Sequence, residues 1–213
     1  MSEAHAAKAA AVHRILARYL VEVVERHALC PWARAAREHG ELAVEIVWGT
    51  PALAAWRAAA ERALARPGAA VAMVVAPELA ITRAALAAVR DQLAAALPAA
   101  GIAEFHPDAA LDLATPARLV PFLRRAPDPL LQLVPLAILD RVRAAPPLAE
   151  RAQQAAMLGG RAAPPRPATA HRIADANHAT LRVAHAEITA TLDAIAADRR
   201  AAYTRAGVLS ASR

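Results

Sequence analysis

The chain has 213 residues, a formal net charge of +6 and only 3% aromatic residues. Its single cysteine cannot form an internal disulfide, and no apolar run approaches the ~20 residues that a membrane span needs. The arginines are scattered and the aromatic side chains that stack on single strands are scarce, which argues against nucleic acid as the main partner. We therefore expect a soluble cytoplasmic protein without membrane contact. A small anionic molecule suits its positive charge better than nucleic acid does.

The first half of the sequence predicts helices that alternate with strands. Apolar residues at spacings of three and four, together with proline and glycine boundaries, predict helices over 5–28, 31–38, 51–66 and 82–97. Short apolar runs predict strands over 41–49, 69–76 and 101–107. This order predicts an α/β fold, with α+β as the alternative, built on a small parallel or mixed three-stranded sheet with helical cover.

The last third predicts helices interrupted by prolines. Asp128 and Pro129 resemble an N-cap and a first helical residue, so a buried helix is expected over 129–143, bent or split at Pro135. A proline- and glycine-rich linker follows at 159–170, and then a final helix at 171–204. The expected organisation is an α/β core over 1–158, this linker, and a helical segment over 171–213 packed on the core.

Cys30 is a candidate for a reactive thiol. If the second helix begins with Pro31, Cys30 becomes its N-cap, where backbone N–H groups favour a thiolate. His27, three residues earlier, would then stabilise the thiolate or act as a base. The alternative is that Cys30 is a small buried apolar residue, a common fate of free cysteine.

A histidine and two arginines suggest a binding site. His106 follows a predicted strand, at the edge where open α/β sheets place ligands, and would be a base, a metal ligand or a hydrogen-bonded loop residue. Arg124 and Arg125 precede the expected helix start at Pro129, which is an arrangement that binds anions. Solvated loop arginines are the alternative.

Other motifs have little weight. His171, His178 and His185 are seven residues apart, about 10 Å along a helix, which is too far for two of them to share one ion. We interpret them as a polar border of the last helix. The sequence lacks glycine-rich phosphate loops and HExxH, CxxC and GxSxG motifs, which argues against P-loop enzymes, common zinc proteases and α/β-hydrolases.

Four short motifs occur in an order that resembles a known family. They are Leu-Cys-Pro-Trp-Ala at 29–33, Phe-His-Pro at 105–107, Arg-Ala-Pro-Asp-Pro at 125–129 and Asn-His-Ala-Thr-Leu at 177–181. In these the chain resembles the uncharacterised bacterial family called domain of unknown function 1415. Ala28, Gln132 and Pro135 stand where that family often has asparagine, histidine and arginine, so the chain resembles a divergent member. The resemblance implies no activity, but it favours a shared role for Cys30, His106 and Arg125.

Three functions fit these residues. The first is an enzyme acting on a small anionic substrate, with Cys30 and His106 catalytic and with Arg125 and Arg124 binding the substrate. The second is a heme- or metal-binding protein in which the Cys30 thiolate, with His106 as a further ligand, holds heme or a transition metal. The sequence itself requires no cofactor. The third is a non-catalytic protein that binds a partner through its last helix, and a homo-oligomer is left open.

Overall fold

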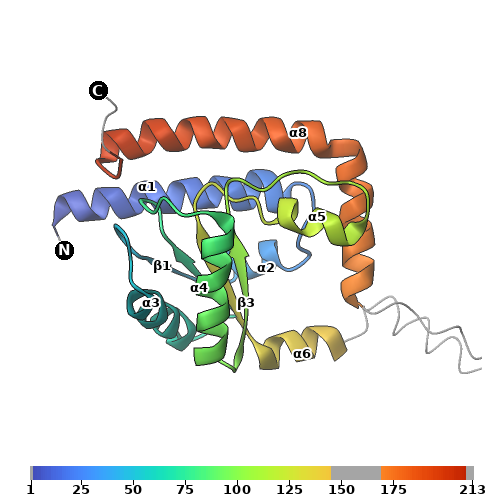
Figure 1. Cartoon of the computed structure of the whole chain (residues 1–213), viewed down its shortest axis with the longest axis horizontal. Coiled ribbons are helices and arrows are strands. Elements are labelled where there is room, and N and C mark those ends of the chain that lie inside the picture. The colour runs from blue at the N-terminus through green and yellow to red at the C-terminus, as the bar shows by residue number, and fades with distance from the viewer. Residues whose placement is uncertain (1, 145–168, 210–213) are drawn as a thin grey trace, which may run out of the picture.

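The computed structural model describes residues 2–144 and 169–209, which form one mixed sheet and the helices around it (Figure 1). The helices are α1 (Glu3–Tyr19), the π-helical η1 (Leu20–Glu25), α2 (Ala33–Glu38), α3 (Leu53–Ala65), α4 (Arg83–Ala96), α5 (Pro116–Leu123), α6 (Leu136–Ala144) and α8 (Thr169–Ala206). The strands are β1 (Leu42–Ile46), β2 (Val71–Val75), β3 (Ala100–Phe105) and β4 (Leu130–Pro135). The predicted α/β class is confirmed, with four strands in place of three.

The sheet has the strand order β1-β2-β4-β3. Strands β1 and β2 are parallel, whereas β4 runs antiparallel to both of its neighbours, β2 and β3. Leu130, at the start of β4, pairs with Val75 and with Phe105, the last residues of β2 and β3. The carboxyl ends of β1, β2 and β3 therefore lie along one edge of the sheet, and the loops that follow them share this edge.

The helix expected over 129–143 is wrong in its first half. Residues 130–135 form strand β4, and helix α6 begins only at Leu136. A strand between two neighbours is buried on both faces, so it has the same continuous apolar sequence as a buried helix. Pro135 ends the strand, where it pairs with Ala100, instead of bending a helix. Asp128 is consequently no helix cap.

Helices cover both faces of the sheet. Trp56 of α3 and Leu86 of α4 pack with Val74 and Leu131 on one face. On the other face, side chains of α1 and α8 pack with Met73, Val75 and Leu130 (Figure 1). Alternate residues of the central strands thus point into two separate apolar layers, as the two-residue period of a strand requires.

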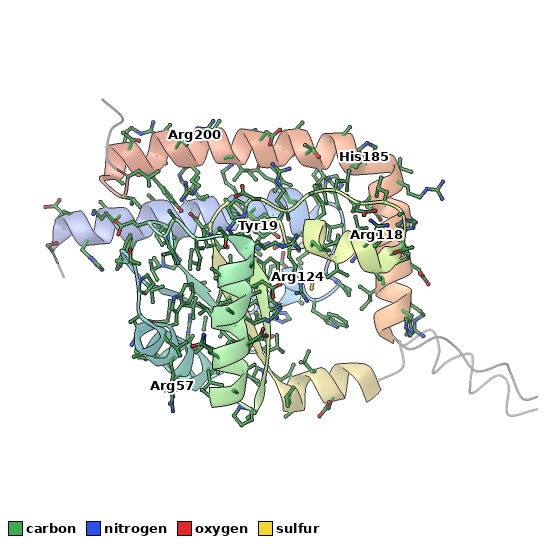
Figure 2. The ribbon with its side chains drawn as sticks, viewed as in Figure 1. Tyr19, Arg57, Arg118, Arg124, His185 and Arg200 are labelled. Atoms are coloured by element: carbon green, nitrogen blue, oxygen red, sulfur yellow. The ribbon has the colours of Figure 1, made fainter. Side chains whose placement is uncertain are left out.

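The last helix lies along the first one. The helix expected over 171–204 is confirmed as α8, whose side chains Leu181, Ile188, Leu192 and Ile195 are buried. Helix α8 bends (Figure 1), and His185 lies near this bend (Figure 2). Its Nδ1 is 3.1 Å from the Leu181 carbonyl oxygen, four residues earlier. A side chain that bonds to a carbonyl of its own helix is a recognised cause of bending. The expected linker lies outside the described residues, except for its last two, which belong to α8.

No helix among the described residues combines the length and the hydropathy that crossing a bilayer would require.

Candidate functional site

His106 is buried directly after β3 and makes three hydrogen bonds to the backbone. Its Nε2 lies 2.8 Å from the Ile81 carbonyl oxygen, and its Nδ1 accepts the backbone N–H of Asp108 at 3.0 Å. A carbonyl only accepts and an amide N–H only donates, so the ring proton is on Nε2. The backbone N–H of His106 also donates to the Arg124 carbonyl at 3.0 Å. Proton transfer or metal binding at this ring would first require breaking one of these bonds.

Arg124 and Arg125 follow α5, but their side chains lie in different surroundings. Arg125 Nε donates to the Pro107 carbonyl at 3.1 Å, and its Nη2 reaches Asp193 of α8 at 3.2 Å. Arg124 instead contacts Glu104 of β3 at 3.4 Å. The helix start expected at Pro129 does not exist, so the helix N-terminus that was to complete this anion site is absent here.

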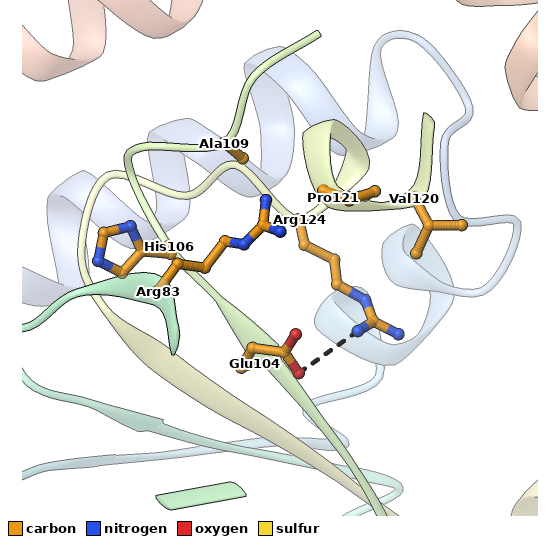
Figure 3. Close-up of a pocket in the computed structure, with 7 residues that line it drawn as sticks. All are labelled: Arg83, Glu104, His106, Ala109, Val120, Pro121 and Arg124. Atoms are coloured by element: carbon orange, nitrogen blue, oxygen red, sulfur yellow. Dashed lines mark hydrogen bonds and ion pairs between the residues drawn. The ribbon is translucent and has the colours of Figure 1, made fainter. Parts of the chain in front are cut away.

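A small pocket of about 50 Å³ lies beside His106, between β3, α4 and α5 (Figure 3). Its polar lining consists of Arg83, Glu104, His106 and Arg124, and its apolar lining of Ala109, Val120 and Pro121. Glu104 belongs to β3, and Arg83 is the first residue of α4, which Thr82 caps. The hydrogen bonds of His106 join the three segments that form this pocket.

The charged side chains that line the pocket have a net positive charge. Two guanidinium groups, those of Arg83 and Arg124, line the pocket with one carboxylate, that of Glu104 (Figure 3). Glu104 is held more closely by Arg90, at 2.5 Å, than by Arg124. Arg83 is exposed and has no ionic or hydrogen-bond partner among the described residues. It also lies at the positive end of the α4 dipole, where a cation costs about 0.3–1 kcal/mol.

Cys30 lies in a turn, not at the start of a helix. Helix α2 begins at Ala33 with Trp32 as its N-cap, so the N-cap position expected for Cys30 is wrong. The thiol is half-buried against the core beside α1 and α8. Burial raises the pKa of the Tyr19 hydroxyl, and the electrostatic interaction with the nearby Cys30 side chain raises it further. Cys30 is not among the described residues that line the pocket.

The turn around Cys30 is held by an unusual helix end. Hydrogen bonds from Arg26 to Val21 and from Leu29 to Val24 span five residues, which defines the π-helix η1. Ala28 then takes a left-handed conformation with φ of 53°. His27 Nε2 is buried without a hydrogen-bond partner in the described part of the chain.

Glu25, at the end of η1, fixes the turn to α2. Its carboxylate is buried and receives two hydrogen bonds from Arg37, at 2.6 and 2.9 Å. Arg37, and to a lesser extent Arg34, holds the pKa of Glu25 below its ordinary value against the opposing effect of burial. The turn that contains Cys30 thus begins at a charged anchor.

The four motifs of the resemblance meet in two pairs. Asn177 of α8 donates to the Leu29 carbonyl at 3.1 Å, which joins the last motif to the Cys30 motif. Arg125 donates to Pro107, which joins the other two. His106, Arg124 and Arg125 are therefore brought together, while Cys30 is held by α8.

The histidines of α8 make separate contacts. His178 Nε2 lies 2.8 Å from the Leu113 carbonyl oxygen, and His185 bonds within its own helix. No group of three or more histidine, cysteine, aspartate or glutamate side chains is placed to hold a metal ion within the ranges that the structure describes.

A buried polar cluster surrounds Asp128, and the sequence does not predict it. Its carboxylate, 1% exposed, accepts hydrogen bonds of 2.6 Å from both Arg199 and Tyr203 of α8. Burial raises the pKa of Asp128, although Arg199 and Tyr203 both oppose this effect. Burial, and next the charge of Asp128, raises the pKa of Tyr203. No local signal could reveal partners 71 and 75 residues away.

Comparison of the chain with protein-family models, curated proteins and solved structures gave no match.

Proposed function

We propose that the protein binds a small anionic molecule in the pocket between β3, α4 and α5, with Arg83 and Arg124 as its ligands. The observation that supports this most directly is Arg83, a guanidinium without a partner in the described residues, beside a second weakly held guanidinium. An anion between them would gain charge-assisted hydrogen bonds from both. It would also offset the unfavourable placement of Arg83 at the positive end of α4.

The size of the pocket limits the anion. A volume of about 50 Å³ is far below the ~300 Å³ at which pockets for drug-sized ligands begin. A carboxylate or a phosphate group fits, with Ala109, Val120 and Pro121 beside any short apolar part. His106 has a supporting role in this proposal, because its hydrogen bonds keep the wall of the pocket in place.

This proposal changes the site expected from the sequence. It keeps three parts of that site, which are the small anionic partner, Arg124 and the position beside His106. Arg83 replaces Arg125, whose guanidinium is used by Pro107 and Asp193. A catalytic step by the Cys30 thiol on the same anion is not part of the proposal, since Cys30 lies outside the pocket lining that the structure describes.

Titration calorimetry with inorganic phosphate and with acetate tests this function. We expect binding by the wild-type protein, weakened roughly 10- to 100-fold by Arg83→Ala and by Arg124→Ala, because each substitution removes a charged hydrogen-bond donor. Arg57→Ala is the matched control, since Arg57 is an exposed arginine on α3 that pairs with Glu61 (Figure 2). Absence of binding at millimolar anion, or an equal loss in the control, would overturn the proposal.

A further inference from the structure

Glu104 is the carboxylate that lines the pocket beside the two arginines proposed to bind the anion. It lies on β3, near the carboxyl end of the strand, and its side chain is 15% exposed. The same oxygen, Oε2, accepts a hydrogen bond from Arg90 and one from Arg124. Figure 3 shows the second of these bonds as a dashed line between Glu104 and Arg124, two of the residues that line the pocket. A negative charge is thus already present where the anion would bind.

The two bonds to Glu104 are unequal. Arg90 lies 2.5 Å from Oε2 and is further held by Asp91 at 2.7 Å. Arg124 lies 3.4 Å from the same oxygen, beyond the usual 2.7–3.2 Å of a protein N–H···O bond. Arg124 is therefore the guanidinium that can leave Glu104 at small cost, while Arg90 stays.

We infer that Glu104 is a built-in competitor for the anion, which holds Arg124 in the free protein and sets the affinity and charge selectivity of the site. The inference rests on the proposed function. An incoming anion must take Arg124 from Glu104 and must remain near the Glu104 charge. Repulsion grows with the charge of the ligand, so a dianion is penalised more than a monoanion. The preferred ligand class is then the small monoanion, such as a short monocarboxylate.

The test compares Glu104→Gln with Asp91→Asn by calorimetry, using acetate and inorganic phosphate. Glutamine keeps the size of the side chain and removes the competing charge. We expect Glu104→Gln to bind acetate roughly tenfold more tightly, and to gain more for phosphate at a pH where it is a dianion. Asp91→Asn removes the other carboxylate that pairs with Arg90. The Asp91 side chain is 68% exposed and does not contact Arg124, so we expect less than a twofold change in the affinity for either anion.

A double-mutant cycle isolates the contact with Arg124. In the Arg124→Ala background, Glu104→Gln should lose most of its effect, because the guanidinium that it releases is missing. Glu104→Asp provides a second variant if the glutamine protein does not fold. Aspartate keeps a carboxylate for Arg90, but its shorter side chain moves that carboxylate away from Arg124. It should give a smaller gain in affinity.

The outcomes separate the two proposals. If the wild-type protein binds neither anion and Glu104→Gln binds neither, the proposed function fails and this inference fails with it. If the wild type binds through Arg83 and Arg124 but Glu104→Gln binds equally or more weakly, the inference alone is overturned. An equal gain in Asp91→Asn would also overturn it, since the effect would then be a general one of net charge.

Discussion

Asp128 is a buried carboxylate whose charge is balanced by residues from the other end of the chain. Arg199 donates to one oxygen and Tyr203 to the other, and Arg199 also donates to the Pro77 carbonyl at 2.7 Å. The guanidinium lies over the Tyr203 ring, 4.6 Å from its centre. Every polar atom of this cluster depends on its partners, because water is excluded from Asp128.

Removal of Arg199 or of Tyr203 should destabilise the protein, and the loss should be larger for Arg199. Arg199→Ala leaves a buried charge without compensation, and we expect a loss of about 3–5 kcal/mol in the free energy of unfolding. Tyr203→Phe removes one hydrogen bond from a group that keeps Arg199, and we expect about 1–3 kcal/mol. Urea denaturation measures both.

Arg200→Ala is the matched control for these two variants. Arg200 is the next residue of α8, and it is exposed on the outer face of the helix (Figure 2). We expect a change below about 0.5 kcal/mol. A loss for Arg199→Ala no larger than this control would show that the buried cluster adds nothing to stability.

The sequence could predict some of these residues and not others. His106 and Arg124 can be named as candidates from the sequence because strand ends and paired arginines are local patterns. Asp-Pro at 128–129 is also a local pattern, and it predicts a helix cap, whereas the partners of Asp128 lie in α8. Arg83 is a single arginine after a threonine, and only the folded neighbourhood brings it beside Arg124.

At the level of elements, α1 and α8 are joined by charges as well as by apolar contacts. Arg14 and Arg18 both donate to Asp198, at 2.7–2.8 Å, and Arg18 also holds Glu22. Arg14 and then Arg18 hold the pKa of Asp198 far below its ordinary value. Arg18 lowers the pKa of Glu22 as well.

These lowered pKa values predict a loss of stability in acid. A carboxylate whose pKa is lower in the folded state stabilises the fold above its unfolded pKa, and this contribution disappears as the pH falls. We expect the melting temperature to fall between roughly pH 5 and pH 2. Asp198→Asn should lower it at pH 7 and make its decrease in acid shallower, as thermal scans at several pH values would show.

Glu61→Gln is a suitable control for the acid effect. It breaks an exposed pair inside α3 instead of a pair between two helices, so we expect a change of at most about 0.5 kcal/mol. A pH profile of Asp198→Asn that runs parallel to the wild type would contradict the role given to Asp198.

The element that the sequence analysis missed is also the one with the least local signal. Helices α1, α3 and α4 have apolar residues on one face, and their period is visible along the chain. Strand β4 is apolar throughout because β2 and β3 flank it, and only the pairing of distant strands distinguishes it from a buried helix. Its antiparallel direction follows from pairing as well, so the mixed character of the sheet could be named only as an alternative to a parallel one.

At the scale of the whole molecule, the two helices from opposite ends of the chain cover one face of the sheet. Ile15 and Tyr19 of α1 share a core with Ile188, Ile195 and other side chains of α8. Figure 1 shows the beginning of α1 and the end of α8 on the same side of the molecule. The core beneath α1 is therefore completed only by α8.

A chain that ends at residue 168 tests this dependence. It lacks the α8 side chains of that core and the partners of Asp128, so we expect binding of the dye ANS and loss of a cooperative unfolding transition. The full-length protein is the reference in both measurements. A truncated chain with the same cooperative transition would show that α8 is dispensable for the core.

The pairing of α1 with α8 also determines how long the apolar face of α1 stays exposed during synthesis. The apolar face that α1 forms together with η1 is complete by Val24, but Tyr203 of the same core is added some 180 residues later. At 5–20 residues per second, the face stays without its cover for roughly 10–40 s. For that period the newly made chain presents an uncovered apolar helix, which is the type of surface that chaperones bind and that aggregates in their absence.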